Sequence, residues 1–536
     1  MAYPVLAPNS TWFAPTNSSV TRSMITEIEI MDSYTPDSSV TVVNSWDASA
    51  AKDGNITCYV IGTKLIIAGN GSGKIAANED SSNCFATPYV AGVTMDLFSS
   101  VTTLTGLNLL DMSNVTTMRN MFYNCSSIIS INASNWDVGS CTDMFAVFYG
   151  CSSMASIDVS TWNVSNVTTM SRMFQSCSSI TSINVSNWDV SNVTDMSMMF
   201  IICSRLKEID VSNWDVSNVT DMSSMFAECK ALVDIDVSNW NVSNVTNMNH
   251  MFDTAALTYL DVSKWNVSSC TKMAFMFYHC SSLGEIDVSN WDVSSLTDLD
   301  HFAAHANLKR RGMEKWNTSS IVNANAAFHN CAEEELDLSG WDVSNVQFFC
   351  QMFENSPNLK RIKGLEKWNT SAGLGFDGMF ERCYVLEEVD LSSFDTSKAK
   401  NGTKASGNGH KTGTLQNMFL SCNNLKKVTV GPNFSINGNG SNTTAGNKAI
   451  LPTPSTDYIE GADGNWYTFT GDAHAPNAMK DKTAETYYAS YNIVADADVI
   501  VKNGSLIDTA KAIREKNGST DKYTPAQFGA AIRALS

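Results

Sequence analysis

LKEIDVSNWDVSNVTDMSSMFAEC, residues 206–229, is one unit of a repeat that fills the middle of the chain. A tryptophan returns at the same place in each unit, every 25–27 residues, at Trp136, Trp162, Trp188, Trp214, Trp240, Trp265, Trp291, Trp316, Trp341 and Trp368, and Phe394 continues the series. A period of this length is typical of a solenoid, in which each unit buries its apolar side chains only against its neighbours. About twelve units fill residues 105–430.

Each unit contains two local patterns. "EIDVS" alternates apolar and polar residues, so a short half-buried strand is expected with Ile209 and Val211 inward. "TDMSSMFAEC" has apolar residues at spacings i, i+3, i+4 and i+7, which predicts a short helix capped by Thr220. We therefore expect an α/β repeat solenoid, with a parallel sheet on one side and short helices on the other.

Composition limits the classes of function. The 536 residues include 54 Asp and Glu against 35 Lys and Arg, a net charge of −19. This balance argues against a nucleic-acid partner and against an anionic membrane surface, both of which need a basic face. The chain also lacks an apolar run long enough to cross a membrane.

Fourteen cysteines raise the question of disulfides. Five of them, Cys125, Cys151, Cys177, Cys203 and Cys229, lie 26 residues apart, yet other units hold Ala306 or Ser356 at this place. A bridging residue would not be exchanged so freely, so we interpret these cysteines as small, reduced core residues. A disulfide ladder is the less favoured alternative, and zinc is less favoured still because no C-x2-C pair occurs.

The string L-x-x-I-D-V-S-x-W-D-V-S-N-V-T-x-M-x-x-M-F-x-x-C resembles the BspA-type leucine-rich repeats of bacterial surface proteins, including Mycoplasma lipoproteins and Firmicute adhesins. The resemblance implies a horseshoe used for adhesion and for recognition of protein or glycan. The start of this sequence, MAYPVLAPNSTWFAP, departs from those proteins because it carries neither a signal peptide nor a lipobox. We therefore expect a protein that is assembled in the cytoplasm and released by lysis.

The two ends suggest how the chain is organised. We expect a virion-docking arm at 1–40, a β-rich N-terminal cap at 41–104 with a hairpin turning at Gly62-Thr63, and the solenoid at 105–430. A loop and a C-terminal cap should follow at 431–500, and a helical hairpin for assembly at 501–536. This last segment resembles a module on tail and fibre proteins of phages of Gram-positive hosts.

These features favour a phage virion protein: a tail fibre, a baseplate adhesin or a capsid-decorating fibre that presents the solenoid to a host-surface protein or glycan. We expect it to contact other virion proteins through either end and to form a homo-oligomer such as a trimer. A bacterial cell-surface BspA-like adhesin is the alternative, and a glycan-degrading virion enzyme is the second alternative. No G-x-S-x-G, H-E-x-x-H or P-loop motif occurs, so an enzyme is not expected.

Candidate binding residues follow from the outward strand position. It holds Asp158, Asp210, Asp236, Asp261, Asp287, Asp337 and Asp390. Stacked carboxylates about 5 Å apart repel one another by about 1 kcal/mol in water. Hydrogen bonds to the flanking backbone, a binding partner or Ca²⁺ would each offset this, and no EF-hand loop is present. The central histidines, among them His279, His301 and His305, leave a transition-metal site as a further alternative, although no metal or cofactor is expected.

Overall fold

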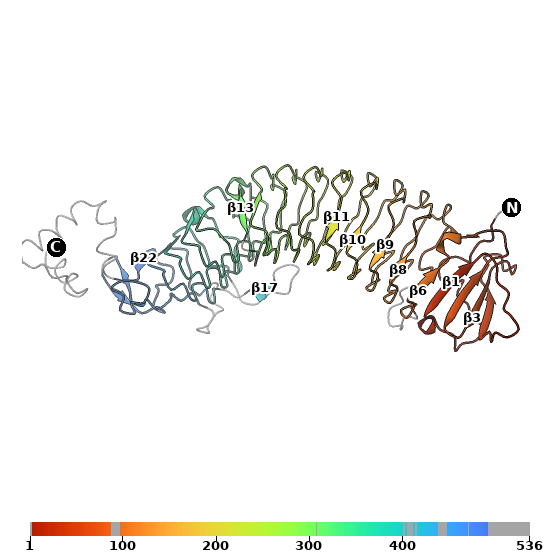
Figure 1. Ribbon diagram of the computed structural model, residues 1–536. Coiled ribbons are helices and arrows are strands. Elements are labelled where there is room, and N and C mark those ends of the chain that lie inside the picture. Colours follow the sequence, from red (N-terminus) through yellow and green to blue (C-terminus); the bar gives the residue numbers. More distant parts are fainter. Residues whose placement is uncertain are drawn as a thin grey trace, which may run out of the picture. The chain divides into compact units, whose positions relative to one another are not determined.

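The computed structural model divides into two compact units, Met1–Trp291 and Asp292–Ser536 (Figure 1). The residues that it describes are 3–86, 97–306, 308–399, 403–404, 411–412, 415–437, 448–469 and 471–490. The helical hairpin expected at 501–536 lies outside the described residues, as do parts of the expected loop at 431–500.

The first unit begins with a five-stranded sheet in the order β2-β3-β4-β1-β6. Its strands are β1 (Glu27–Met31), β2 (Asn44–Asp47), β3 (Thr57–Ile61), β4 (Lys64–Ala68) and β6 (Thr103–Thr105). β3 and β4 pair antiparallel around Gly62, which has φ 60°, so the predicted hairpin is confirmed. β1 lies parallel between β4 and β6.

The predicted boundary at residue 40 is wrong. β1 lies inside the cap sheet, and the segment before it is buried against the cap. Trp12 is fully buried, and its indole N–H donates to the carbonyl of Cys84 at 2.7 Å. Apolar side chains such as Trp12 and Phe13 complete the core of this small sheet, so residues 3–40 belong to the cap and do not form a separate arm.

Short parallel strands follow, most of them at the place in the repeats where the sequence predicts a strand. The first unit contains β5 (Ile75–Ala76), β7 (Leu110–Asp111), β8 (Ser130–Ile131), β9 (Ser156–Ile157), β10 (Ser182–Ile183), β11 (Glu208–Ile209) and β12 (Glu285–Asp287). Figure 1 shows its successive turns of chain side by side, with β8 to β11 along one edge. In parallel pairs such as Ser182 with Glu208, each strand meets the same position of the next repeat.

The second unit continues the repeat and ends in a mixed sheet. Its parallel strands are β13 (Lys309–Arg311), β14 (Glu335–Asp337), β15 (Arg361–Lys363), β16 (Glu388–Leu391) and β19 (Lys427–Val430). β22 (Glu485–Tyr488) pairs antiparallel with β19 and extends the sheet through β20 (Trp466–Thr468) and β21 (Ala473–His474). β17 (Thr403–Lys404) and β18 (Lys411–Thr412) pair with each other.

Stacked side chains form the core of each unit. The rings of Trp188 and Trp214 lie 6.4 Å apart and nearly parallel, and the Trp214 indole N–H donates to the carbonyl of Val185 at 3.1 Å. Cys203 donates its thiol to the carbonyl of Phe174 at 3.2 Å. All fourteen cysteines are buried and unbridged, as the reduced-core interpretation requires.

The predicted helix of each repeat is wrong. Among the described residues the only helical pieces are 3₁₀ turns, at Arg22–Met24, Leu107–Leu109, Met313–Lys315 and Leu365–Lys367. In the segment 220–229, the backbone N–H groups of Met222, Ser224 and Phe226 donate to carbonyls of the next unit at 2.8–3.0 Å. Ser224 itself takes the left-handed conformation, with φ 56°.

The apolar spacing therefore predicts correctly which side chains are buried, but the helix that it predicts for the backbone is wrong. Met222, Met225, Phe226 and Cys229 are all fully buried, as the pattern predicts. The pattern does not reveal where the backbone hydrogen bonds go. In the stack, the next repeat presents a row of backbone carbonyls. The N–H groups of the tandem turns donate to these carbonyls, whereas those of a helix would donate to carbonyls of the same segment. In its described residues, the solenoid is thus built from strands and turns, without the helical layer of an α/β fold.

No helix that could span a bilayer is found among the residues described above.

Candidate ligand-binding face

The predicted aspartate stripe lies on the outward side of the strands. Five of its members are exposed, and Asp261 and Asp287 are half-buried. Each of the seven accepts a hydrogen bond from the backbone N–H of the serine two residues later, at 2.9–3.1 Å. In five of them the serine hydroxyl donates as well, at 2.6–2.7 Å.

These bonds explain how the stripe tolerates its own charge. The hydroxyl of Ser160, followed by its backbone N–H, lowers the pKa of Asp158, and the matching serines lower the pKa values of Asp236, Asp261 and Asp337. Asn184 accepts the same two bonds from Ser186 without a charge. The stripe is therefore mainly a row of turns, and within the described ranges no group of three or more His, Cys, Asp or Glu could hold a metal ion.

The outward face of the first unit, which we call the first strand face, is small, polar and acidic. Its strands present Ser130, Ser156 and Ser182, then Glu208 and further acids. Three large apolar side chains interrupt this polar surface, because Ile129, Val233 and Tyr259 are 57%, 50% and 65% exposed.

The second strand face, formed by β14, β15, β16 and β19, alternates in charge from strand to strand. Acids precede or lie on β14 and β16, and bases precede or lie on β15 and β19. The ion pairs run between neighbouring strands, with Lys360 Nζ 2.8 Å from Glu334 and Lys426 Nζ 3.0 Å from Glu387. Arg361 lies between three carboxylates, those of Glu335, Glu387 and Glu388, at 3.5–3.9 Å.

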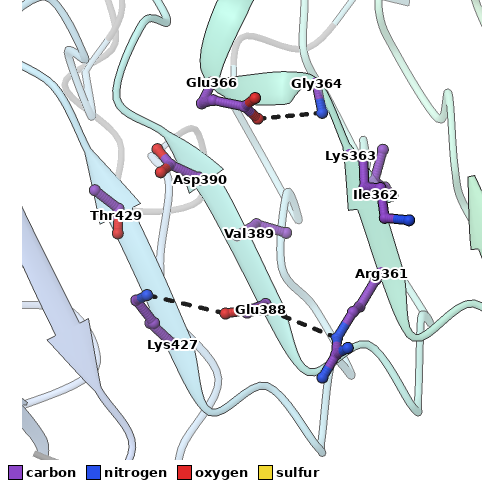
Figure 2. A pocket seen from close by; sticks show the side chains of 10 residues that line it. All are labelled: Arg361, Ile362, Lys363, Gly364, Glu366, Glu388, Val389, Asp390, Lys427 and Thr429. Atoms are coloured by element: carbon purple, nitrogen blue, oxygen red, sulfur yellow. Dashed lines mark hydrogen bonds and ion pairs between the residues drawn. The ribbon is translucent and has the colours of Figure 1, made fainter. Parts of the chain in front are cut away.

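A hollow of about 370 Å³ opens on the second strand face. Figure 2 shows its lining, with Arg361 and Glu388 directed toward each other from adjacent strands. It is lined by Arg361, Ile362, Lys363, Gly364, Glu366, Glu388, Val389, Asp390, Lys427 and Thr429. Only Asp390 among these was predicted from the sequence as a binding residue.

Gly364 shapes this hollow. It takes φ 99°, and a Cβ there would lie 2.4 Å from the backbone of Ser339, so only glycine fits. The chain then enters the 3₁₀ turn Leu365–Lys367, and the Glu366 carboxylate accepts the Gly364 N–H at 3.1 Å. Five other repeats have D-V-S here, beginning at Asp158, Asp210, Asp236, Asp261 and Asp287. A glycine in place of this valine is the sequence signal that was missed.

The same substitution occurs twice more. Gly106 and Gly312 have φ 76° and 99°, and each precedes a 3₁₀ turn. A second hollow, of about 460 Å³, lies beside Gly106 and is lined by neutral residues such as Thr103, Asn108 and Ile129. Replacing the usual bend by glycine and a 3₁₀ turn therefore accompanies both hollows.

The histidines do not form the metal site that was weighed as an alternative. His250 Nδ1 lies 2.8 Å from Asp253, and His301 Nδ1 lies 2.6 Å from Asp300. His329 is buried, and its Nε2 lies 4.0 Å from Glu354. Burial, followed by the nearby His305 and His301, lowers the pKa of His329 to about 3, so this ring is neutral at physiological pH.

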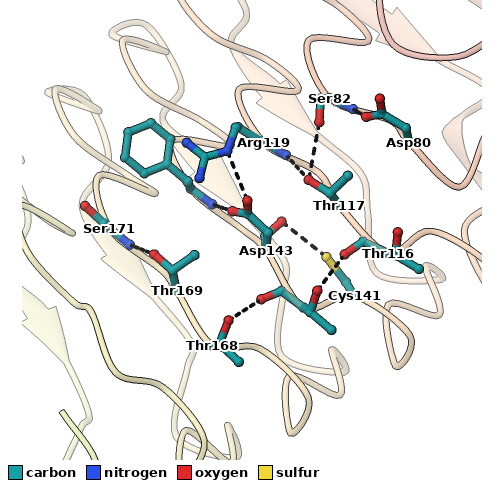
Figure 3. A network of polar contacts seen from close by, with 12 residues as sticks. Asp80, Ser82, Thr116, Thr117, Arg119, Cys141, Asp143, Thr168, Thr169 and Ser171 are labelled. Atoms are coloured by element: carbon teal, nitrogen blue, oxygen red, sulfur yellow. Dashed lines mark hydrogen bonds and ion pairs between the residues drawn. The ribbon is translucent and has the colours of Figure 1, made fainter.

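On the turn side of the first compact unit, polar contacts link successive repeats. The hydroxyl of Thr168, which is labelled in Figure 3, donates to the carbonyl of Thr142, 3.1 Å away. Arg119 pairs with Asp143 at 3.0 Å and covers the ring of Phe145 at 4.3 Å. These contacts are structural, because each side chain bonds to the neighbouring turn.

The sequence profile of one protein family matches the repeats. It is described as "Mycoplasma protein of unknown function, DUF285", and it matches residues 94–208, 174–286, 202–310, 276–363 and 337–427. These overlapping matches together cover residues 94–427, more than half of the chain. No curated protein matches the chain.

Several solved structures are similar. A leucine-rich cell-surface protein from Faecalibacterium prausnitzii is 16% identical, with 72% of this chain and 89% of that chain covered and a TM-score of 0.31. A leucine-rich-repeat protein from Bacteroides ovatus is 14% identical, with coverage of 57% and 85% and a TM-score of 0.27. One from Eubacterium ventriosum is 13% identical, with coverage of 71% and 84% and a TM-score of 0.24.

Proposed function

The chain belongs to the family described as "Mycoplasma protein of unknown function, DUF285", and from this premise we propose that it is a bacterial surface protein that binds a host-surface protein or glycan without catalysis. The outward strand faces are the binding surface. This role corresponds to the cellular adhesin that the repeat resembles.

One observation carries the proposal: the outward strand positions of successive units form continuous exposed faces whose residues are not needed for the core. The inward positions repeat almost unchanged, whereas the outward ones change from serine to acid, base or tyrosine. Such variation on a constant scaffold is how repeat proteins acquire binding surfaces. Tyr259, 65% exposed, is of the residue type most often found at the centre of protein interfaces.

Binding of the fluorescently labelled full chain to host cells tests the proposal. We expect saturable binding that falls at least about fivefold when Tyr259→Ser and Val233→Ser are combined on the first strand face, or when the second strand face is altered. A matched control is Tyr458→Ser, which removes an exposed tyrosine from the turn at 456–458, outside the strands of both faces. Binding that none of the strand-face changes affects would refute the assignment of the surface.

A phage virion role is the second candidate. It depends on the resemblance of the helical hairpin at 501–536 to a phage tail module, and on this reading the chain would be a homo-oligomer held to other virion proteins by its ends. Immunogold labelling of cells and particles with antibody to the repeats separates the two candidates. We expect gold on cell envelopes; gold at fixed sites on heads or tails of particles would establish the virion role instead.

A further inference from the structure

The hollow beside Gly364 has a specific chemistry that the proposed function does not define. β15 and β16 are joined near their starts, where the Glu387 N–H donates to the carbonyl of Lys360 at 3.1 Å. Beyond this bond they belong to different sheets, because the chain after Lys363 turns at Gly364 while β16 continues to Leu391. The hollow occupies the interval between the two strands (Figure 2).

The floor of the hollow is partly apolar. Ile362 is half-buried, whereas the equivalent inward residues of other repeats, such as Ile209 and Leu336, are at most 8% exposed. Val389 lies beside it at 3%. A ligand with a flat face of C–H groups would cover Ile362 and remove this apolar surface from water.

The walls of the hollow are charged, and their charges cancel. Three cations, Arg361, Lys363 and Lys427, oppose the three carboxylates of Glu366, Glu388 and Asp390. A ligand with a net charge would therefore gain little from one half of the lining and be repelled by the other half. A neutral ligand that both donates and accepts hydrogen bonds would use both halves.

The side chains of the walls retain capacity for a ligand. Arg361 Nε lies 3.7 Å from Glu388, and Lys427 Nζ lies 3.9 Å from the same carboxylate. Both separations exceed the 2.7–2.9 Å of a charge-assisted hydrogen bond. Within the described part of the chain, the guanidinium of Arg361 forms ion pairs at these longer distances and no hydrogen bond. Hydroxyl groups could therefore accept from Arg361 and Lys427 and donate to Glu388.

We infer that the hollow between β15, β16 and β19 binds a neutral sugar unit of a glycan. A pyranose ring has an apolar C–H face for Ile362 and hydroxyls at its rim for the alternating carboxylates and cations. The volume of about 370 Å³ is within the range of small-molecule sites. This inference rests on the proposed function and names the ligand class of one part of its surface.

A glycan array that contains neutral, sialylated and sulfated glycans tests the inference with the full chain. We expect neutral glycans to bind, and calorimetry of the tightest one should give a Kd that changes less than about twofold between 50 and 500 mM NaCl, because no net charge is neutralised. Binding restricted to charged glycans, or no glycan binding at all, would overturn the inference.

Two substitutions at one position give the matched comparison. Thr429→Tyr fills the hollow and should weaken neutral-glycan binding at least about tenfold, whereas Thr429→Val keeps the shape and should stay within about threefold. Equal thermal unfolding midpoints for both variants show that the fold is intact. Equal affinities of Thr429→Tyr and the natural chain would contradict the site.

The proposed function and this inference fail in different ways. If the chain binds host cells, free neutral sugars do not compete, and Thr429→Tyr binds as well as the natural chain, the inference is wrong and the surface role stands. If the chain binds the neutral glycan on the array but not host cells, the sugar site stands and the proposed surface role is wrong.

Discussion

On the first strand face, small polar and acidic residues surround Ile129, Val233 and Tyr259, whereas on the second strand face acids and bases alternate and pair across the strands. In both faces the inward positions of the repeats hold the same types of buried residue. The stacked core therefore fixes the backbone, and the outward positions are free to take different chemistry. The first face is acidic with apolar anchors, and the second is balanced and contains the hollow.

The turn sides of the two compact units also differ in the residues that they carry at equivalent positions. At one turn position the first unit carries Tyr123, Tyr149 and Ile201, whereas the second carries His329, Glu354 and Glu381, all three of which are buried. Burial of ionisable groups is costly unless they are paired or neutral. The second unit should therefore respond to pH in a way that the first does not.

The largest expected effect concerns what the two units share. Trp214→Ala in the first compact unit and Trp341→Ala in the second should each cost about 3–5 kcal/mol of unfolding free energy. Each change removes a buried ring and its hydrogen bond to the preceding repeat. Denaturant unfolding of the full chain measures both. Trp214→Phe is the control, since Phe394 holds this place naturally and the loss should be smaller. A cost below about 1 kcal/mol in one unit alone would contradict a common core.

A smaller effect should appear in the second unit as the pH changes. Burial, followed by the charges of Glu381 and Glu354, raises the pKa of Asp377 to about 6, well above the ordinary value of 3.8. The folded state thus holds this proton more tightly than the unfolded state. The stability that the proton provides is complete below about pH 3.8 and is lost as the pH rises through 6.

Asp377→Asn tests this sign. The variant should be more stable than the natural chain by about 1–2 kcal/mol at pH 7.5, and the difference should vanish near pH 3.8. Thermal unfolding across this pH range measures it, with Asp210→Asn on the first strand face as the matched control. A gain that is independent of pH would contradict the assignment of the raised pKa to Asp377.

His329 should act in the opposite direction. Its pKa in the folded state is lowered to about 3, so the unfolded state takes up a proton first as the pH falls below about 6.5. The stability that the neutral ring provides is therefore lost between pH 6.5 and 3. His329→Gln should remove this part of the acid sensitivity, measured as a flatter dependence of unfolding free energy on pH. An unchanged slope would show that His329 titrates normally.

The left-handed turn positions give a further, smaller comparison. Ser176 in the first compact unit and Asn355 in the second have φ 61° and 54°. Gly150 holds the position of Ser176 one repeat earlier. Serine is strained there, whereas asparagine tolerates the conformation. Ser176→Gly should stabilise the chain by about 0.5–1 kcal/mol, while Asn355→Gly should change little. Chemical denaturation measures both, and Ser176→Val, which should destabilise, is the control.

The smallest effect is expected in the aspartate stripe. Asp210→Asn should change the unfolding free energy by less than about 0.5 kcal/mol, because asparagine also accepts the bonds from Ser212, as Asn184 does from Ser186. Asp210→Ala should cost more, since it leaves the turn without an acceptor. Equal losses for the two variants in denaturant titrations would show that charge matters here more than hydrogen bonding.

The sequence predicted the period, the buried set and most of the strands correctly, because stacked repeats place their inward residues at fixed spacing. No strand forms at 231–237 or 257–262, although the same pattern is present there. It did not predict the turns at 220–229, since i, i+3, i+4, i+7 spacing is shared by helices and by tandem turns that bond to a neighbour. It placed Asp390 on the binding face but missed Arg361, Lys363 and Lys427. These become neighbours only because β15 lies beside the sheet that contains β16 and β19. The glycine at position 364 was the one local sign of the hollow.

Hydrogen exchange of the full chain, with and without the tightest-binding neutral glycan, tests the central claim most directly. We expect slower exchange confined to residues 360–366, 388–391 and 427–430, with no change at 206–211 on the first strand face. Protection on the turn side at 220–229 and its equivalents, or at the cap strands alone, would contradict recognition through the second strand face.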